Sequence, residues 1–235
     1  MPYAAGRTGT SSQERIPVDG ITLEGDLTIP EGATAIVLFA HGSGSSRFSP
    51  RNRAVASELQ SAGFATLLLD LLTVEEEDAE AATRHLRFNI ELLATRLGAA
   101  TDWIGRRADT RTLPIGYFGA STGAAAALVA ASRRRHIVRA VVSRGGRPDL
   151  AGTALGMVQA ATLLIVGSLD TQVIALNEEA YRRLTCAKRI DIVPGATHLF
   201  EEPGALESVS RLARQWFDEY LVVRREQNAA PVRAW

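Results

Sequence analysis

The sequence predicts an α/β protein built on a mostly parallel central sheet, with an N-terminal antiparallel hairpin and helices on both faces. Short segments rich in Val, Ile, Leu and Phe alternate along the chain with longer segments of helical periodicity. Several short segments are apolar at every position, which is typical of strands buried on both faces. Right-handed strand–helix–strand crossovers then make neighbouring strands parallel. We expect one domain over residues 1–235, with flexible termini at 1–13 and 227–235.

An antiparallel hairpin is predicted at the start of this domain. The segments Glu14–Val18 and Ile21–Ile29 flank Asp19-Gly20, and Asp-Gly between two alternating strands is a strong hairpin signal. The remaining strands are expected at 36–40, 64–70, 113–118, 137–143, 162–167 and 188–193. The sheet is therefore expected to be mixed, antiparallel at its start and parallel afterwards.

Helices are predicted in the intervals between these strands. Ser49-Pro50 starts the first one, because Ser caps free amides and Pro suits the first helical position, and Gly63 is its expected C-terminal cap. The next helix is long, and its apolar residues recur at spacings of four and three: Leu86, Ile90, Leu93, Leu97, Ala100 and Ile104. Further helices are expected at 122–132, 174–184 and 205–225, and the acidic run 75–78 is expected to be a loop.

Composition and charge exclude several classes of protein. Hydrophobic residues make up 46% of the chain and the formal net charge is zero, so a sizeable core can form and no broad field favours nucleic acid or an anionic membrane. The single cysteine, Cys186, excludes an intrachain disulfide and a cysteine-rich zinc site. Residues 1–13 lack the apolar core of a signal peptide, and the apolar runs are too short to span a bilayer. We expect a cytoplasmic protein without a nucleic-acid or membrane partner; its oligomeric state stays open.

A candidate nucleophile lies where an expected strand meets an Ala-rich helix. Gly119-Ala120-Ser121-Thr122-Gly123 matches the pattern G-x-S-x-G after the strand 113–118. In this pattern the serine occupies a strained strand-to-helix turn, and the glycines allow close packing where a Cβ would clash. The free amides of the helix N-terminus favour negative charge beside the serine. The pattern predicts Ser121 as a nucleophile; the alternative is a tight glycine-rich turn with a serine cap.

A base and an acid are predicted to complete a triad. His198 follows the last expected strand, and Asp170 follows the strand 162–167, so both lie at the carboxyl ends of strands. The chain order Ser121, Asp170, His198 is the order of the triad in proteins with such an elbow, where the acid orients the imidazole. Asp149 is the alternative acid. The other three histidines are assigned to structural or surface positions: His41, His85 and His136.

The loop after strand 36–40 is the candidate oxyanion hole. It contains His41-Gly42-Ser43-Gly44-Ser45-Ser46, whose small residues let backbone amides approach a developing negative charge. The amide of Ser43, or of Gly44, and the amide of Thr122 are the predicted donors. A phosphate-binding loop is the alternative for a Gly/Ser-rich segment, but no G-K-[ST] follows.

Arginines near the expected carboxyl edge of the sheet are candidate substrate-binding residues. Arg47, Arg144 and Arg147 follow expected strands there, and a guanidinium binds a carboxylate through two hydrogen bonds. The alternative is that these side chains are solvated surface charges. The acidic run 75–78 lies on the same side and is expected to be solvated. The alternative is that it disfavours anionic substrates.

Four motifs together resemble those of the α/β-hydrolase superfamily, and most of all its dienelactone-hydrolase-like branch. They are His41–Gly44, Gly119–Gly123, Gly167–Asp170 and Gly195–His198. The segment 70–88 is similar to stand-alone or phosphoribosyltransferase-fused hydrolases of that branch, and no transferase portion is expected within these residues. Dienelactone hydrolases proper carry Cys where this chain has Ser121, so the resemblance implies ester hydrolysis rather than activity on dienelactones. Family members with a cap insert it after the strand 137–143, and residues 144–161 are too few for a large cap domain.

The triad and the resemblance imply a serine hydrolase of the carboxylesterase type. It would cleave small-molecule esters of small to medium acyl groups through an acyl-enzyme, in an open cleft and without a metal or organic cofactor. A thioesterase, an amidase or an acyltransferase would use the same triad. An alternative from another class is a non-catalytic binding protein that kept the hydrolase scaffold.

Overall fold

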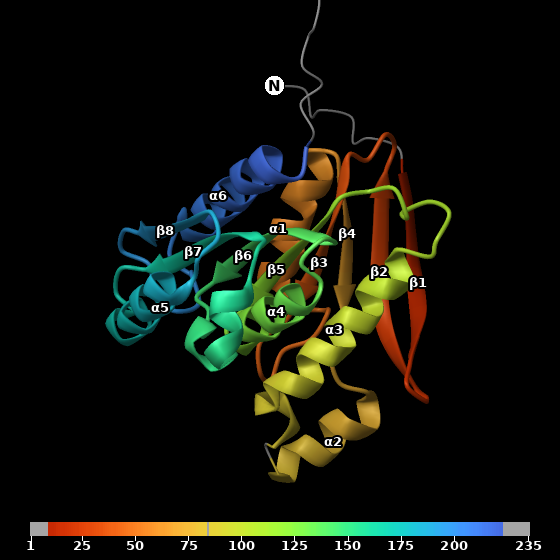
Figure 1. Ribbon diagram of the computed structural model, residues 1–235, viewed down its shortest axis with the longest axis horizontal. Coiled ribbons are helices and arrows are strands. Elements are labelled where there is room, and N and C mark those ends of the chain that lie inside the picture. Colours follow the sequence, from red (N-terminus) through yellow and green to blue (C-terminus); the bar gives the residue numbers. More distant parts are fainter. Residues whose placement is uncertain (1–8, 84, 223–235) are drawn as a thin grey trace, which may run out of the picture.

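The protein is described by a computed structural model that covers residues 9–83 and 85–222. Within these residues one eight-stranded sheet has the order β1-β2-β4-β3-β5-β6-β7-β8 (Figure 1). The pairs β1–β2 and β2–β4 are antiparallel, and all other neighbouring strands are parallel. The predicted mixed α/β sheet with an N-terminal antiparallel hairpin is confirmed.

The strands lie close to the predicted ranges. They are β1 (Gly9–Val18), β2 (Ile21–Pro30), β3 (Ala35–Ala40), β4 (Phe64–Leu69), β5 (Ile115–Ala120), β6 (Val138–Arg144), β7 (Ala161–Gly167) and β8 (Lys188–Val193). β3, β4, β5 and β7 are buried at every position, which explains why their sequences are almost entirely apolar. Asp19 and Gly20 both have positive φ, as a tight hairpin turn between β1 and β2 requires.

The expectation of a flexible N-terminus over residues 1–13 is wrong for residues 9–13. They form the first half of β1, and their backbone pairs in register with β2 from Gly9 opposite Pro30 onward. Their side chains are exposed and polar, so no apolar alternation marks this part of the strand in the sequence. Backbone pairing at the sheet edge determines the conformation instead. The predicted flexible segment at 227–235 and residues 1–8 lie outside the described residues.

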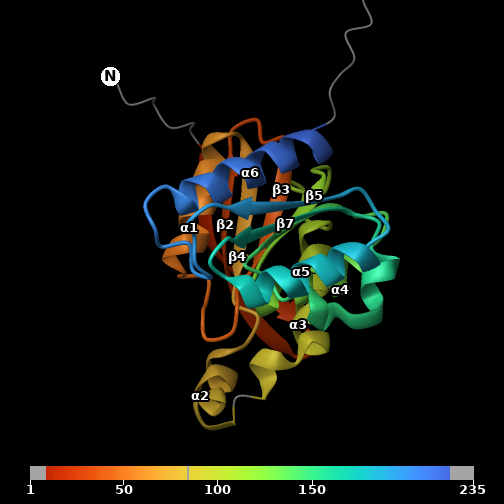
Figure 2. The same cartoon turned by 90° about the vertical axis from the view of Figure 1, so that its left-hand side faces the viewer.

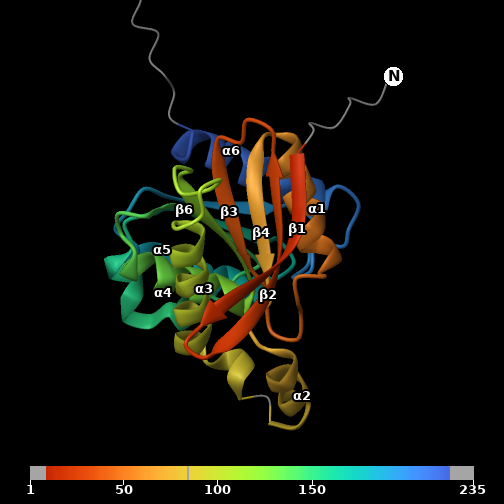
Figure 3. The same ribbon diagram turned by 90° about the vertical axis from the view of Figure 1, so that its right-hand side faces the viewer.

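Helices cover both faces of the sheet. They are α1 (Pro50–Ser61), α2 (Val74–Thr83), α3 (Ile90–Ile104), α4 (Thr122–Arg133), α5 (Thr171–Arg183) and α6 (Ala205–Tyr220), with 3₁₀ turns η1 (Leu86–Phe88) and η2 (Pro148–Met157). One apolar cluster packs α1 and α6 on one face, and another packs α3, α4 and α5 on the other (Figures 2 and 3). The connection from β6 to β7 contains only η2, so the predicted absence of a large cap domain is confirmed. None of the described helices combines the length and apolarity that crossing a bilayer requires.

Two helical expectations between β4 and β5 are corrected. The long helix begins at Ile90 rather than near residue 86, because the Asn89 side chain accepts the Leu92 amide at 3.1 Å and starts the helix there. The acidic run expected as a loop belongs to α2. Thr73 and Glu76 exchange hydrogen bonds at 2.8 and 3.3 Å, a reciprocal cap at the start of this helix. α2 projects beyond the carboxyl ends of the parallel strands (Figure 1).

Candidate active site

Ser121 occupies the turn between β5 and α4 in a strained backbone conformation. Its φ is 50° and its ψ is −122°, values that a non-glycine residue rarely adopts. A Cβ on Gly123 would lie 2.2 Å from the carbonyl oxygen of Ala40, and one on Gly119 would lie 2.5 Å from the Ala124 Cα. The two glycines therefore let helix and strands pack backbone to backbone, and Ser121 is held at the carboxyl edge of the sheet.

This close packing gives a first test. Gly123→Ala is expected to lower the free energy of unfolding by about 3 kcal/mol, because the new methyl group meets backbone that has no room to move. Gly156→Ala is the matched control, since a Cβ there meets nothing within 4 Å. That control is expected to change stability by less than about 1 kcal/mol. Urea denaturation of both variants measures the difference, and equal stability of the two would contradict the packing argument.

Asp170 and His198 contact each other directly. The His198 Nδ1 lies 2.6 Å from the Asp170 Oδ2. The loops that carry them are joined by two further bonds: the Leu169 amide donates to the Ala196 carbonyl at 2.9 Å, and the Gly195 amide donates to the Ser168 hydroxyl at 2.8 Å. An ionised carboxylate only accepts hydrogen bonds, so Nδ1 carries the proton and Nε2 keeps its lone pair.

Ser121 and His198 line one pocket of about 230 Å³. Asp170 lies behind the imidazole, with its side chain 15% exposed against 40% for His198. The alternative acid, Asp149, is engaged elsewhere: it accepts two hydrogen bonds from the Arg147 guanidinium at 2.8 and 2.9 Å. The structure therefore brings Asp170, not Asp149, to the histidine that shares a pocket with Ser121.

The two predicted oxyanion-hole residues are hydrogen-bonded to each other. The Ser43 amide donates to the Thr122 Oγ1 at 3.0 Å, and the two hydroxyl oxygens lie 2.9 Å apart. The Ser43 hydroxyl also donates to the Arg87 carbonyl at 3.2 Å. Thr122 is the first residue of α4, so its amide has no partner within the helix. To donate to an oxyanion at Ser121, the Ser43 amide would have to break its hydrogen bond to the Thr122 hydroxyl or donate to both acceptors.

His41 has the structural role expected of it. Its Nε2 accepts the Leu71 amide at 3.0 Å, and its Nδ1 lies 2.9 Å from the Gly42 carbonyl. The ring is 6% exposed and ties the end of β3 to the segment after β4. These bonds hold the loop that carries Ser43.

The three predicted substrate-binding arginines have different surroundings. Arg147 is paired with Asp149 and is not among the residues that line the pocket of Ser121. Arg47 forms ion pairs with Asp70 and Asp26, and it is not among the residues that line the pocket of Ser121. Arg144 lines that pocket although its residue is only 7% exposed. It ends β6, and its carbonyl accepts the Ser121 amide at 3.3 Å. Arg144 therefore lies beside the candidate nucleophile.

Sequence reasoning missed Arg51, which lines the same pocket. It lies in the first turn of α1, and the Ser49-Pro50 start signal placed that turn just after the candidate oxyanion loop. Burial, and then the positive charge of Arg51, lower the pKa of Arg144 to about 10. Arg144 thus keeps its charge at neutral pH in a pocket where that charge is poorly solvated.

Comparison with known proteins assigns the family. The sequence pattern of the dienelactone hydrolase family matches residues 23–222. The chain belongs to the dienelactone hydrolase family. Two Mycobacterium tuberculosis proteins, provisionally named phosphoribosyl transferases, are 59% identical to this family member over 201 residues. Those residues are 86% of this chain but 44% of each relative, so the chain spans less than half the length of these curated relatives.

Solved structures of similar proteins confirm the fold of this family member. A dienelactone hydrolase from Anabaena variabilis is 60% identical with a TM-score of 0.89, and the match covers 91% of this chain and 99% of that one. Est1E from Butyrivibrio proteoclasticus shares the fold at 18% identity, with a TM-score of 0.72 over 88% of this chain and 98% of its own. The predicted α/β-hydrolase fold and the resemblance to the dienelactone-hydrolase-like branch are confirmed.

Proposed function

We propose that this protein hydrolyses carboxylic esters of small molecules through an acyl-enzyme on Ser121. The observation that carries the proposal is the 2.6 Å contact between Asp170 and His198, with that histidine lining the pocket of a strained serine. An acid–imidazole pair next to a serine is the arrangement that activates a hydroxyl for attack on a carbonyl carbon.

The proposed reaction has two halves. In the first, Nε2 of His198 takes the hydroxyl proton of Ser121 as its Oγ attacks the ester carbonyl, and the imidazolium gives that proton to the leaving alkoxide. In the second, water attacks the acyl-enzyme with His198 again as base, and Ser121 regains its proton as the acid leaves. The amides of Thr122 and Ser43 hold the oxyanion in both halves.

The size of the pocket supports acyl groups of small to medium length. A volume of about 230 Å³ is below the range of pockets that enclose drug-sized ligands. The described connection from β6 to β7 contributes only η2, which leaves the cleft without a large cap over it. Phosphoribosyl transfer is not proposed, because the chain spans less than half of the relatives that carry that name.

One panel of substrates tests the proposal and ranks its alternatives. The full chain is incubated with a fluorophosphonate probe and, in the same buffer, with matched phenyl esters, thioesters and anilides of acetate, butyrate and octanoate. We expect covalent labelling, turnover of the acetyl and butyryl esters, and slower turnover of octanoate. Labelling with faster thioester or anilide turnover would favour a thioesterase or an amidase. A folded chain that neither labels nor turns over any substrate would instead be a binding protein on this scaffold.

A further inference from the structure

The Arg144 guanidinium is buried without a compensating charge. The residue is 7% exposed, and no carboxylate pairs with it among the described residues. Its polar contact there is long, at 3.5 Å from Nη2 to the Asn52 Oδ1, and its Nε has no hydrogen-bond partner. The ring of Phe200 lies 5.9 Å from its Cζ. A buried arginine is normally paired with a carboxylate, so this one lacks a partner of opposite charge.

A second guanidinium lines the same pocket. Arg51 donates from Nη1 to Glu201 at 2.8 Å, but its Nε is buried and has no partner. The side chains of Asn52 and Ser49 come from the same turn of α1 and also line the pocket. Arg144, Arg51 and Glu201 together carry one net positive charge, and the N-terminal end of α1 adds to the positive potential there. The Asp170 carboxylate is bound to His198 and is not among the residues that line the pocket.

We propose that Arg144 and Arg51 form a subsite for an anionic oxygen group of the substrate, a carboxylate or a phosphate. This inference rests on the proposed function and names its substrate class: a short ester that carries a negative charge near the scissile bond. The arginines and the Ser121–His198 pair line one pocket of about 230 Å³, so a single small molecule can reach both. Bound anion would supply acceptors for the two unpartnered Nε groups and neutralise the buried charge.

Glu201 is expected to weaken the binding of an anionic substrate group by Arg51. It is 63% exposed at its side chain and competes with substrate for the Arg51 guanidinium. Removing its charge leaves Arg51 free to bind the anion. Variants at Glu201 and at the arginines should therefore change the preference for anionic esters in opposite directions.

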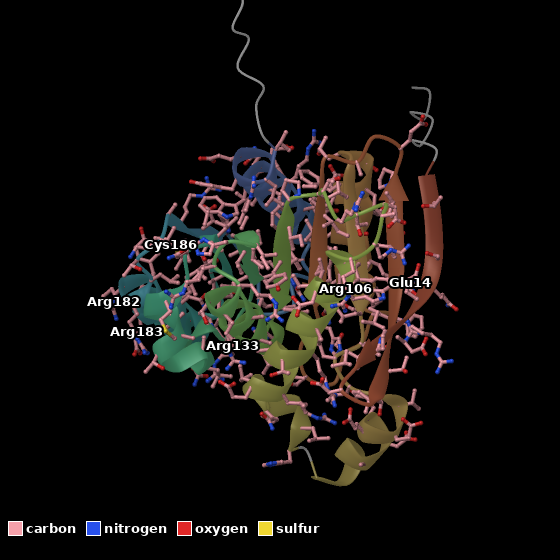
Figure 4. All side chains as sticks on the ribbon, turned by 45° about the vertical axis from the view of Figure 1, so that its right-hand side comes forward. Glu14, Arg106, Arg133, Arg182, Arg183 and Cys186 are labelled. Atoms are coloured by element: carbon pink, nitrogen blue, oxygen red, sulfur yellow. The ribbon has the colours of Figure 1, made fainter. Side chains whose placement is uncertain are left out.

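The experiment compares kcat/KM for neutral and anionic esters of the same leaving group. The substrates are phenyl butyrate, monophenyl succinate and phenyl phosphonoacetate; the proteins are wild type, Arg144→Met, Arg51→Gln, Glu201→Gln and a control, Arg133→Gln. Arg133 is the last residue of α4, the helix that begins beside Ser121 (Figure 4). The Arg133→Gln variant therefore also loses one positive charge, but at the end of that helix far from Ser121. Its side chain is 42% exposed and pairs with Glu91.

We expect wild type to prefer an anionic ester over the neutral one by at least about 30-fold, as expected for a desolvated charge pair. Arg144→Met should remove most of that preference, Arg51→Gln should reduce it, Glu201→Gln should raise it, and Arg133→Gln should leave it unchanged. Faster hydrolysis of monophenyl succinate would identify the subsite as one for carboxylates. Faster hydrolysis of phenyl phosphonoacetate would identify it as one for phosphates. Equal rates for neutral and anionic esters in wild type, or the same preference in wild type and Arg144→Met, would overturn the subsite.

A binding measurement separates this inference from the proposed function. Calorimetric titration of succinate and of methylphosphonate into Ser121→Ala, with and without Arg144→Met, needs no turnover. Binding that weakens at least about tenfold with Arg144→Met supports the subsite even if no ester is hydrolysed. Ester hydrolysis without anion binding would support the proposed hydrolase function and overturn the proposed anion subsite. The melting temperature of Arg144→Met is expected to equal or exceed that of wild type, because a buried unpaired charge is removed.

Discussion

Replacing Ser121 by alanine is expected to lower kcat for ester hydrolysis by about 10⁴-fold or more and to abolish labelling by a fluorophosphonate. The hydroxyl is the proposed attacking atom, and no acyl-enzyme forms without it. The fold should remain, because alanine tolerates the packing around β5 and α4 at least as well as serine does. Residual turnover would come from the amides of Ser43 and Thr122 acting on bound ester with water as the nucleophile.

A matched serine provides the control for this prediction. Ser143 is buried in the neighbouring strand β6, and its hydroxyl has no hydrogen-bond partner. Ser143→Ala should keep both labelling and turnover, because it removes only an unsatisfied polar group. Steady-state kinetics, probe labelling and circular dichroism of the two variants are the measurements. Normal turnover by Ser121→Ala would refute the nucleophile assignment.

Replacing Asp170 by asparagine is expected to lower kcat by about 10⁴-fold. The carboxylate accepts the Nδ1 proton of His198 at 2.6 Å and thereby keeps Nε2 free to act as base. An amide in its place can donate to Nδ1, which moves the imidazole proton to Nε2 and removes the base. The same substitution also withdraws the negative charge that stabilises the imidazolium during the reaction.

Asp149→Asn separates the two candidate acids. Its carboxylate is paired with Arg147 rather than with His198, so kcat should change by less than about threefold. Both variants are measured on the same phenyl ester at several pH values. A large loss in Asp149→Asn together with a small one in Asp170→Asn would assign the acid to Asp149 instead.

Most of the fold could be predicted because burial on two faces leaves a strong pattern. β3, β4, β5 and β7 are almost entirely apolar, and each lies within two residues of its predicted start and end. The errors fall where other interactions determine structure. Residues 9–13 are polar and exposed yet form a strand through pairing with β2. The acidic run was expected as a loop, but a cap at Thr73 and an ion pair of Glu76 with Arg96 hold α2.

The candidate site could be predicted in part. Ser121 and Asp170 follow the buried parallel strands β5 and β7, and His198 follows the partly buried parallel edge strand β8. The carboxyl ends of parallel strands meet at one edge of a sheet. Position after a strand did not show which of the candidate arginines lines the pocket of Ser121. Arg47 and Arg144 both follow strands, but Arg47 is neutralised by Asp26 of β2 and Asp70 after β4, which are distant in sequence. The Ser49-Pro50 signal placed Arg51 in a helical turn just after the candidate oxyanion loop. It did not indicate that the side chain lines the pocket, because an arginine in a first helical turn is usually solvated.

By itself, the sequence determined the class of fold, the order of the strands along the chain and the three residue types at strand ends from which a triad can be built. These depend on local burial and on chain order, which a sequence records directly. Only the tertiary structure decided which acid meets His198, that Ser43 and Thr122 bind each other, and that Arg144 is buried without a carboxylate. Hydrogen bonds and charge pairing act over a few ångströms between residues far apart in the chain, so their outcome appears only once the backbone has brought them together.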